Sequence, residues 1–331
     1  MAAIQQAPVA AHELVVEPGQ LPKLRSNYGN VIDSESTGWL KPTPRDTPLE
    51  EMRRRFDEDG YVWVKNVIPR EVVLDMRQHY FEHMSPTGLL APNTSPRAGI
   101  FNPALNPLTH HGVGGHDLPP SAEQVSLLTS AHSTSSYLAF LKNDSLRAFI
   151  RGFTGWEQEV LVVRTLLRHN VPRGLSTGVH YDKLFLRGGS ADFLTGWVPI
   201  GDCGAEGGGL MYLEGSTALG KKIEAEFWRG SEGMTPEQRI DAFNVNMTRD
   251  GQLTHDAEEF GRTKGEGRMR WLTGNFEAGD VVFHNPYMIH GASKNEDPEG
   301  RIRLSTDLRF YEEGAALDKR WMSIWRPDDG L

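Results

Sequence analysis

The sequence predicts a mainly β domain with flanking helices, of the sandwich or jelly-roll class. After residue 157, short segments rich in β-branched and aromatic residues follow one another between turns containing Gly, Pro or Asp. Few helical patterns separate these segments, which disfavours a parallel βαβ sheet. Residues 47–155, by contrast, carry most of the helical periodicity. We therefore expect helices to flank a β domain formed mainly by the second half of the chain.

Length and composition are compatible with one domain. The chain has 331 residues, of which 38% are hydrophobic, enough to bury one substantial core. Residues 1–45 are polar and punctuated by Pro and Gly, so we expect an N-terminal arm. Residues 46–331 are predicted to form a single domain, with a lid loop at 85–125 and an insertion at 219–272.

Charge, hydropathy and cysteine content disfavour a nucleic-acid partner, a membrane span and a disulfide. The net charge is −9, and no run of Lys and Arg indicates a nucleic-acid partner. No apolar run is long enough for a membrane span, and the N-terminus lacks the basic region of a secretory signal. The single cysteine, Cys203, excludes an intrachain disulfide and is interpreted as a buried small hydrophobe. We expect a cytoplasmic protein that acts on a small molecule; a homodimer is compatible with the sequence.

Helices dominate the first half. Thr47 is the expected N-cap of a helix whose first residue is Pro48 and which ends at Gly60. The segment 61–64, Tyr-Val-Trp-Val, reads as a short strand. Further helical faces follow at residues 69–84 and, with a break near 143–144, at 135–155.

Five histidines of this half are candidate metal ligands on chemistry alone. His79 and His83 lie four residues apart on the expected helix 69–84. No carboxylate or cysteine motif accompanies them, so surface histidines are the better interpretation. The loop 85–125 contains three more, interpreted as substrate-facing or solvated rather than as a second metal site: His110, His111 and His116.

The second half alternates strands and turns. Strands are expected at 160–167, around 180, and at 193–200, 209–213, 281–284 and 301–310. The run Glu-Gly-Gly-Gly at 206–209 leads into a strand and not into a helix. A tight turn is therefore expected there, and not a phosphate-binding loop.

Residues 178–183, Gly-Val-His-Tyr-Asp-Lys, contain a pattern with metal-binding chemistry. In an extended segment, His180 and Asp182 project from one face while Tyr181 projects from the other. An imidazole and a carboxylate on one face, joined by a remote histidine, form the facial triad that leaves open positions on non-heme Fe(II). Taken alone, a His-x-Asp sequence is more often an ordinary surface pair.

Two later histidines have the chemistry to complete this set. His284 precedes Asn285 and Pro286, which break the expected strand. His290 follows the break and precedes Gly291, which permits close approach of backbone or substrate. We favour His290 as the third ligand and His284 as a core residue or a hydrogen-bonding partner of the ligands.

Residues 301–310 alternate polar and apolar side chains, which is a strong strand signal. The polar face of such a strand either meets water or lines a polar cavity. In the second case Arg303 and Ser305 are suited to hold the carboxylate of a diacid cosubstrate.

In their order and spacing, these motifs resemble the phytanoyl-CoA dioxygenase family of Fe(II)- and 2-oxoglutarate-dependent oxygenases. The likeness extends over most of residues 53–311. It is carried by the segments 56–62, 180–182, 206–210 with 214–216, 279–284 with 290–291, and 303–305. The resemblance implies a double-stranded β-helix, a cupin-like jelly roll, with Fe(II), 2-oxoglutarate and O2 as cofactor and cosubstrates.

The resemblance also implies residue roles. His180, Asp182 and His290 correspond to the family's metal ligands, and Arg303, in an Arg-x-Ser pattern, corresponds to its 2-oxoglutarate arginine. Arg301 competes for that role, because the spacing from the distal histidine varies in the family.

Other positions bear on the cosubstrate and the substrate. Ser305 completes the Arg-x-Ser pattern, and Trp197 lies where the family often has an aromatic residue beside the cosubstrate. Tyr181, where glutamine is frequent, and the 219–272 insertion depart from the common pattern. These departures bear on the substrate more than on the chemistry.

The implied activity is oxidation of an unactivated C–H bond in a small natural product or metabolite, with release of succinate and CO2. Hydroxylation is the expected outcome, with desaturation or rearrangement as variants of the same chemistry. The retained carboxylate of Asp182 disfavours a halogenase. The alternatives are a cupin-like isomerase or hydrolase with another metal, and a non-catalytic ligand-binding protein of the same fold.

Overall fold

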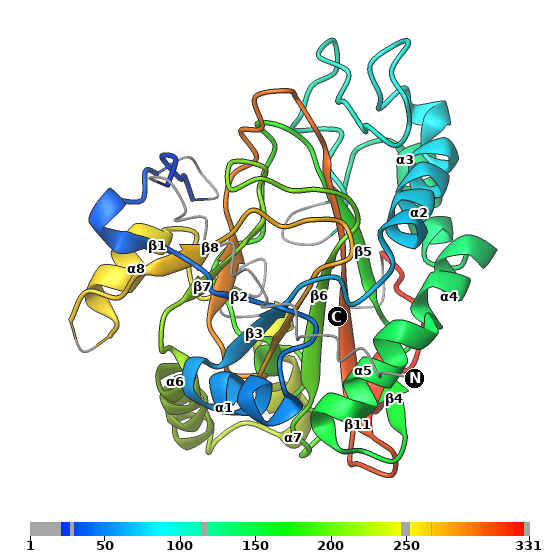
Figure 1. Cartoon of the computed structure of the whole chain (residues 1–331). Helices are drawn as coiled ribbons and strands as arrows, with labels where there is room; N and C mark the ends of the chain where they lie inside the picture. Colours follow the sequence, from blue (N-terminus) through cyan, green and yellow to red (C-terminus); the bar gives the residue numbers. More distant parts are fainter. Residues whose placement is uncertain (1–20, 27–29, 114–117, 246–251, 266, 328–331) are drawn as a thin grey trace, which may run out of the picture.

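Two β-sheets pack face to face, and helices cover the outer face of the larger one (Figure 1). The structure is a computed structural model that describes residues 21–26, 30–113, 118–245, 252–265 and 267–327. The smaller sheet has the strand order β1-β8-β7-β10, and the larger one β2-β3-β9-β6-β11-β4, with β5 also paired to β11. The prediction of a jelly roll with flanking helices is confirmed.

The last strand organises the larger sheet. β11 (Arg303–Glu312) pairs antiparallel with β6 over residues 305–310 on one side and with β5 over 303–307 on the other. The other strands are shorter: β1 Thr37–Trp39, β2 Pro42–Thr43, β3 Tyr61–Val64, β4 Glu159–Leu161, β5 Leu166–Asn170, β6 Leu194–Pro199, β7 Leu210–Leu213, β8 Trp271–Thr273, β9 Val281–His284 and β10 His290–Ala292.

A helical layer packs against the larger sheet. It consists of α1 (Leu49–Asp59), α2 (Arg70–His83), α3 (Ala122–Ala131), α4 (Ser135–Leu141) and α5 (Asp144–Thr154). Leu304, Leu308 and Phe310 of β11 lie in the apolar layer between helices and sheet. Phe283 of β9 stacks on Phe149 of α5, with ring centroids 5.2 Å apart. The even positions of the alternating stretch therefore face the helices, which leaves the odd positions for the space between the sheets.

The expected insertion 219–272 is largely helical. It contains α7 (Pro236–Val245) and α8 (Ala257–Thr263), and α6 (Thr217–Gly230) begins just before it. Its last two residues lie in β8, so the β domain resumes before the expected boundary. Phe260 of α8 packs with Trp271 in an apolar cluster beside the smaller sheet.

Part of the expected N-terminal arm completes the sheets. β1 pairs parallel with β8 in the smaller sheet, and β2 pairs parallel with β3 in the larger one. The first helix begins at Leu49 with Pro48 as its N-cap, so the prediction of Thr47 as cap is wrong. Gly60 ends this helix as predicted, with a left-handed φ of 79°.

Most other expected elements are confirmed, with one correction to a strand. The expected strand 160–167 is two strands, because β4 pairs with the end of β11 at 310–312 whereas β5 pairs with its start. Between them the Arg164 amide donates to the carbonyl of Trp321, outside the ladder. The expected break near 143–144 is present, and the Asn143 side chain caps α5.

The described part of the loop 85–125 contains more regular structure than expected. A short 3-10 helix, Ser85–Thr87, begins it, and α3 starts at its end. Arg77 of α2, which is buried, donates to the carbonyls of Arg97 and Ala98 in the loop and of Ile200 and Ile302 at strand ends. One guanidinium thus attaches the loop to the larger sheet, and a role of the loop as a lid stays a prediction.

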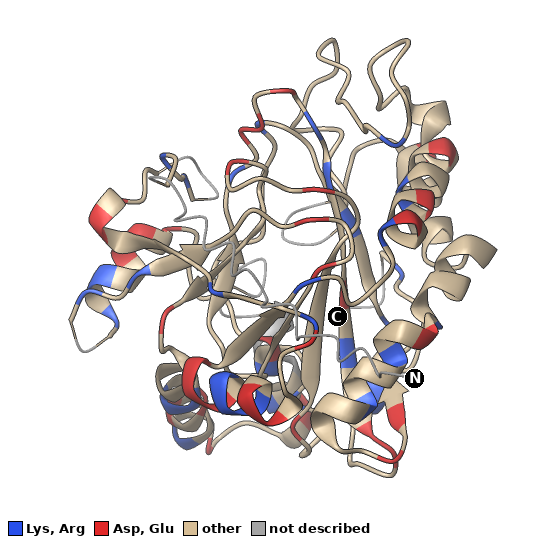
Figure 2. Cartoon of the chain, viewed as in Figure 1, with Lys and Arg blue, Asp and Glu red and all other residues tan. Residues whose placement is uncertain are grey.

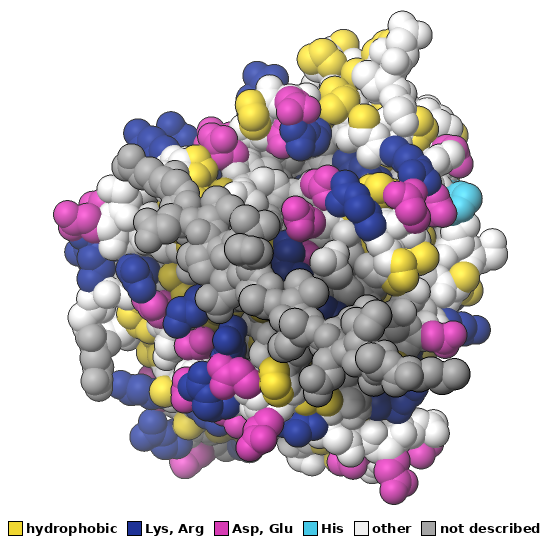
Figure 3. Space-filling view, in the orientation of Figure 1, with side chains coloured by type: hydrophobic (Ala, Val, Ile, Leu, Met, Phe, Trp, Pro, Cys, Tyr) yellow, Lys and Arg dark blue, Asp and Glu magenta, His cyan; other side chains and the backbone are white. Residues whose placement is uncertain are grey.

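Charges are mixed on the surface. Acidic and basic residues are interspersed along the outer helices (Figure 2), and no extended patch of one sign gathers on the face shown in Figure 3. This distribution gives no sign of a nucleic-acid surface on the elements in view. Among the described helices, none is long and apolar enough to cross a membrane.

We expect acid to destabilise the protein through two buried imidazoles. Burial lowers the pKa of His132 and that of His169 to about 4, whereas an unfolded histidine titrates near ~6.5. Between these values the unfolded chain binds protons that the folded chain does not. The free energy of unfolding therefore falls as the pH falls from ~6.5 to ~4.

Urea unfolding at pH 7 and pH 5 measures this effect. The expected loss is about 2 kcal/mol per histidine, the equivalent of ~1.5 pKa units. His132→Gln should remove its share of the pH dependence. Equal pH dependence in the wild type and in the variant would contradict the assignment to His132.

Candidate metal centre

Two of the expected ligands are direct neighbours across a β-bridge. His180 and His290 exchange both backbone hydrogen bonds, each with an N···O distance of 2.8 Å. Their ring centroids lie 4.2 Å apart, and both residues are buried. A Cβ at Gly291 would lie 3.3 Å from the carbonyl oxygen of Gly178, so the glycine after His290 permits this close approach of the two segments.

Hydrogen bonds set the tautomer of both imidazoles. Nδ1 of His180 donates to the carbonyl of Gly178, and Nδ1 of His290 donates to the carbonyl of Met288, each at 2.9 Å. A carbonyl only accepts, so each Nδ1 carries the proton and each Nε2 keeps its lone pair. Burial also lowers the pKa of both rings, which favours the neutral form that binds metals.

Asp182 supplies a carboxylate to the same place. Its Oδ1 lies 4.0 Å from Nε2 of His180 and 4.0 Å from Nε2 of His290. Among the described residues these three form the group of His, Cys, Asp and Glu side chains close enough to share a metal ion, with ligand atoms within 4.8 Å of one another. Asp182 begins a 3-10 helix (Asp182–Leu184) instead of continuing a strand. Tyr181 before it is extended and points elsewhere, bonding Glu224, so the expected alternation holds.

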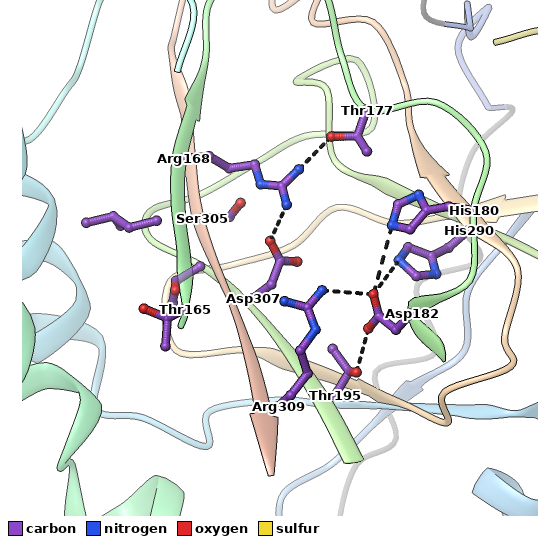
Figure 4. Close-up of polar contacts among 12 residues, drawn as sticks. Thr165, Arg168, Thr177, His180, Asp182, Thr195, His290, Ser305, Asp307 and Arg309 are labelled. Atoms are coloured by element: carbon purple, nitrogen blue, oxygen red, sulfur yellow. Dashed lines mark hydrogen bonds and ion pairs between the residues drawn. The ribbon is translucent and has the colours of Figure 1, made fainter. Parts of the chain in front are cut away.

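The surroundings of Asp182 decide which of its oxygens faces the histidines (Figure 4). Oδ2 accepts a hydrogen bond from Oγ1 of Thr195 at 2.6 Å. It also accepts one from Nε2 of His284 at 3.2 Å. Oδ1 accepts from Nη2 of Arg309 at 2.8 Å. Burial by itself raises the pKa of this carboxyl, but Arg309 and the hydrogen bond from His284 outweigh it and hold the pKa well below its usual range. The carboxylate is therefore ionised.

His290 and His284, the two candidates for the third metal ligand, lie at different positions relative to Asp182. His290 joins the group, whereas His284, which is fully buried at the end of β9, contacts Asp182 through the oxygen turned away from that group. Its Nδ1 lies 3.3 Å from the hydroxyl of Tyr212. His284 therefore orients the carboxylate, as the sequence led us to favour.

Arg303 and Arg301 differ in burial and in their acidic partners. Arg303 is 4% exposed, and its Nε donates to the carbonyl of Gly208 at 3.0 Å and its Nη1 to Oγ of Ser305 at 2.6 Å. None of the described carboxylates pairs with it, and burial lowers its pKa to about 10. Arg301 is partly exposed and pairs with Asp297 and Glu299 of the preceding loop. A buried arginine without an acid partner is suited to an anionic ligand.

Trp197 is fully buried on the face that carries the polar residues. It lies directly opposite Asp307 in the β6–β11 ladder and two residues after Thr195. Its indole packs edge-on against Phe276, with centroids 4.8 Å apart. Beside it, Arg168 of β5 pairs with Asp307 at 3.0 Å. The space between the sheets is thus lined by aromatic and ionic side chains near the metal group.

The remaining sequence candidates lie apart from this group. His110 and His111 bond backbone carbonyls of their own loop, and His116 lies outside the described residues. Cys203 is buried, and burial raises the pKa of its thiol to about 11, so it is an inert core residue as expected.

Sequence reasoning does not single out Thr195 or Arg309, although both contact Asp182. A signal for Arg309 was present, because it lies on the odd positions of the alternating stretch, on the same face as Arg303. Thr195 gave no such signal, since its position opposite Arg309 depends on the register of two strands.

The donor set fits a divalent iron ion. Two neutral imidazoles and one ionised carboxylate on one side of a metal form the facial triad of non-heme Fe(II) enzymes. All three ligand residues are buried, with at most 5% of the residue exposed, so water has little access behind them. Hydrogen-bonded Nδ1–H groups and a hydrogen-bonded carboxylate are the usual supports of such ligands.

Comparison with known protein families gives a match over most of the chain. The model of the family described as phytanoyl-CoA dioxygenase (PhyH) matches residues 56–302. This range contains the three side chains of the metal group and ends just before Arg303.

Three of the solved structures that resemble this chain illustrate the comparison, and all three have low sequence identity to it. The α-ketoglutarate-dependent epimerase SnoN from nogalamycin biosynthesis is 17% identical, with 80% of this chain and 82% of that chain covered and a TM-score of 0.46. The carbocyclase SnoK from the same biosynthesis is 19% identical, with coverage of 82% and 87% and a TM-score of 0.46. EvdO2 from Micromonospora carbonacea var. aurantiaca, complexed with 2-oxoglutarate, is 16% identical, with coverage of 87% and 99% and a TM-score of 0.45.

Proposed function

The chain belongs to the phytanoyl-CoA dioxygenase family of non-heme iron, 2-oxoglutarate-dependent enzymes, and we propose that it oxidises a C–H bond of a small molecule, most often by hydroxylation. The observation that carries this proposal is the meeting of His180, Asp182 and His290 from two remote segments around one point. The assignment of Fe(II) and 2-oxoglutarate as cofactor and cosubstrate follows from family membership.

In this proposal His180, Asp182 and His290 hold the iron. The support is local chemistry: Oδ1 of Asp182 lies 4.0 Å from Nε2 of each histidine, and the other polar atoms of these side chains are already hydrogen-bonded. The ligands therefore need little rearrangement when the ion binds, which favours affinity.

Arg303 and Ser305 hold the far carboxylate of 2-oxoglutarate in this proposal. Arg303 is buried, positively charged and without an acid among the described residues, and the Ser305 hydroxyl already orients its guanidinium. Trp197, on the same face of the neighbouring strand, limits the space beside the cosubstrate. A dicarboxylate fits this lining better than a neutral ligand, because it neutralises the buried charge.

When bound, Fe(II) and 2-oxoglutarate supply the oxidising chemistry, with O2 consumed and succinate and CO2 released. The protein supplies position and a dry site. Burial of the ligands and of Arg303 keeps bulk water from the polar face of β11, so charges there interact strongly. Arg309, Thr195 and His284 hold the carboxylate of Asp182 in one orientation throughout.

The proposal is tested by incubating the purified protein with Fe(II), 2-oxoglutarate and O2 and measuring succinate. We expect slow succinate release that needs both Fe(II) and 2-oxoglutarate and that rises when a true substrate is added from a panel of small metabolites. Mass spectrometry of the product then distinguishes gain of one oxygen atom from loss of two hydrogens. Metal-dependent turnover of a substrate without consumption of 2-oxoglutarate would instead identify a cupin-like isomerase or hydrolase.

A further inference from the structure

Three arginines lie on the polar face between the sheets, and their partners differ. Arg168 pairs with Asp307 and also donates to Oγ1 of Thr177 at 2.6 Å. Arg303 has no acid among the described residues. Arg309 has Asp182, whose Oδ1 is the atom turned toward the two histidines. Among the described residues, Asp182 is the carboxylate that pairs with Arg309, so Arg309 shares this partner with the metal position.

Arg309 has donors for which the described part of the chain offers no acceptor. It is 2% exposed, and Nη2 makes its hydrogen bond to Asp182. Nε and Nη1 are buried and have no hydrogen-bond partner among the described residues. Leaving buried charged donors unsatisfied is costly, so two such groups on one guanidinium indicate an acceptor other than the described protein groups.

The guanidinium of Arg309 lies over an aromatic ring beside the metal position. Its carbon lies 5.1 Å from the ring centroid of Trp321, and the indole of Trp321 donates to the carbonyl of Phe185 in the segment after Asp182. Phe185 in turn packs edge-on against His180, with ring centroids 5.6 Å apart. Stacking and hydrogen bonding thus fix Arg309 next to the ligands, which reduces the entropy lost on binding an anion.

Arg309 and Thr195 grip Asp182 from neighbouring strands. They are direct cross-strand partners in the β6–β11 ladder, and they bind opposite oxygens of the carboxylate. One edge of the guanidinium is used for this contact, and the remaining N–H groups are available for a second acceptor close to the metal position. The charge favours an anion, because one carboxylate does not neutralise both Arg309 and a divalent ion.

We propose that Arg309 is a second cosubstrate-binding arginine, which holds the carboxylate next to the 2-oxo group while Arg303 holds the far carboxylate. The proposal rests on the proposed function and adds a clamp at the metal end of the same dianion. It also gives Arg309 two contacts at once, one to the metal ligand Asp182 and one to the cosubstrate. The two arginines lie six residues apart on one face of β11, at opposite parts of the polar lining.

The test uses two ligands to distinguish binding at the metal end of the cosubstrate from binding at its far carboxylate. 2-Oxoglutarate has both ends, whereas oxalate chelates a divalent ion through its carboxylates and has no far carboxylate. Dissociation constants are measured by calorimetry with Mn(II) at saturating concentration, after the Mn(II) affinity of each variant is determined. We expect Arg309→Met to weaken the binding of oxalate and of 2-oxoglutarate by similar factors of about 10 or more, because each ligand loses a charged hydrogen bond.

Matched variants make the result specific. Arg303→Met should weaken the binding of 2-oxoglutarate and leave the affinity for oxalate unchanged. Thr195→Val removes a hydrogen bond to Asp182 without removing a cation, so oxalate affinity at saturating Mn(II) should stay within about 2-fold of the wild type. Arg309→Lys, which keeps one charge without the fork, should be intermediate and provides a second variant if Arg309→Met folds poorly.

Three outcomes would each contradict either the inference or the proposed function. If Arg309→Met and Arg309→Lys bind both ligands as the wild type does at saturating Mn(II), Arg309 only positions Asp182 and the inference is wrong. If the wild type binds Mn(II) but not 2-oxoglutarate, the proposed function itself fails. A shift in Mn(II) affinity alone, with unchanged oxalate affinity, also contradicts the anion contact.

Discussion

Asp182→Ala is expected to abolish 2-oxoglutarate turnover and to weaken binding of Fe(II) or Mn(II) by at least about 100-fold. Loss of an outer partner of a metal ligand typically costs about 10–100-fold in affinity, and loss of the charged ligand itself exceeds that range. Succinate formation and calorimetric metal binding are the two measurements. The substitution also leaves Arg309 buried without its acid, so thermal unfolding of the metal-free variant must be recorded alongside.

Asp307→Asn is the matched control for this experiment. Asp307 is also a buried acid paired with an arginine, but it is not among the side chains that meet at the metal position. We expect its metal affinity to stay within about 10-fold of the wild type, below the loss expected for a ligand. Asp182→Ala with full metal affinity and full succinate release would overturn the assignment of the three ligands.

Arg303→Met is expected to raise the dissociation constant of 2-oxoglutarate by about 100-fold while leaving metal affinity unchanged. A guanidinium makes two charge-assisted hydrogen bonds to a carboxylate, each contributing about 1.5–3 kcal/mol. Methionine preserves apolar bulk in the buried site and removes both bonds. Calorimetry with Mn(II) present measures the cosubstrate affinity, and the Michaelis constant for 2-oxoglutarate should rise in parallel.

Arg301→Met provides the control for Arg303. Arg301 is partly exposed and pairs with loop acids, so its removal should change 2-oxoglutarate affinity by less than about 3-fold, in keeping with the small contribution of exposed ion pairs. The reverse pattern, a large loss in Arg301→Met and none in Arg303→Met, would transfer the cosubstrate role to Arg301. The two variants thus decide between the two candidates that the sequence leaves open.

Local patterns were sufficient for much of the fold. The strands at 61–64, 193–200, 209–213 and 281–284 follow from β-branched and aromatic runs between turns, and the structure places β3, β6, β7 and β9 there. The helices were identified where their apolar residues recur at helical spacing. The division of the strand predicted at 160–167 has a tertiary cause, because β4 and β5 pair with different parts of β11.

By itself, the sequence determined the chemistry available to the site. The His-x-Asp spacing put two donors on one side of an extended segment, and the alternation in 301–310 put Arg303 and Ser305 on one face of a strand. These are short-range consequences of backbone geometry, so they can be read from neighbouring residues. Even the choice of His290 over His284 followed from the strand break between them.

Only the tertiary structure decided how those donors are surrounded. Whether the polar face of β11 meets water or an enclosed lining depends on the second sheet, and every residue from Arg303 to Tyr311 is in fact buried. The contacts of Asp182 with Thr195, His284 and Arg309 join residues 13, 102 and 127 positions away. Such contacts depend on strand register and sheet packing, which no local pattern specifies, because the same side chains could equally face solvent in another register.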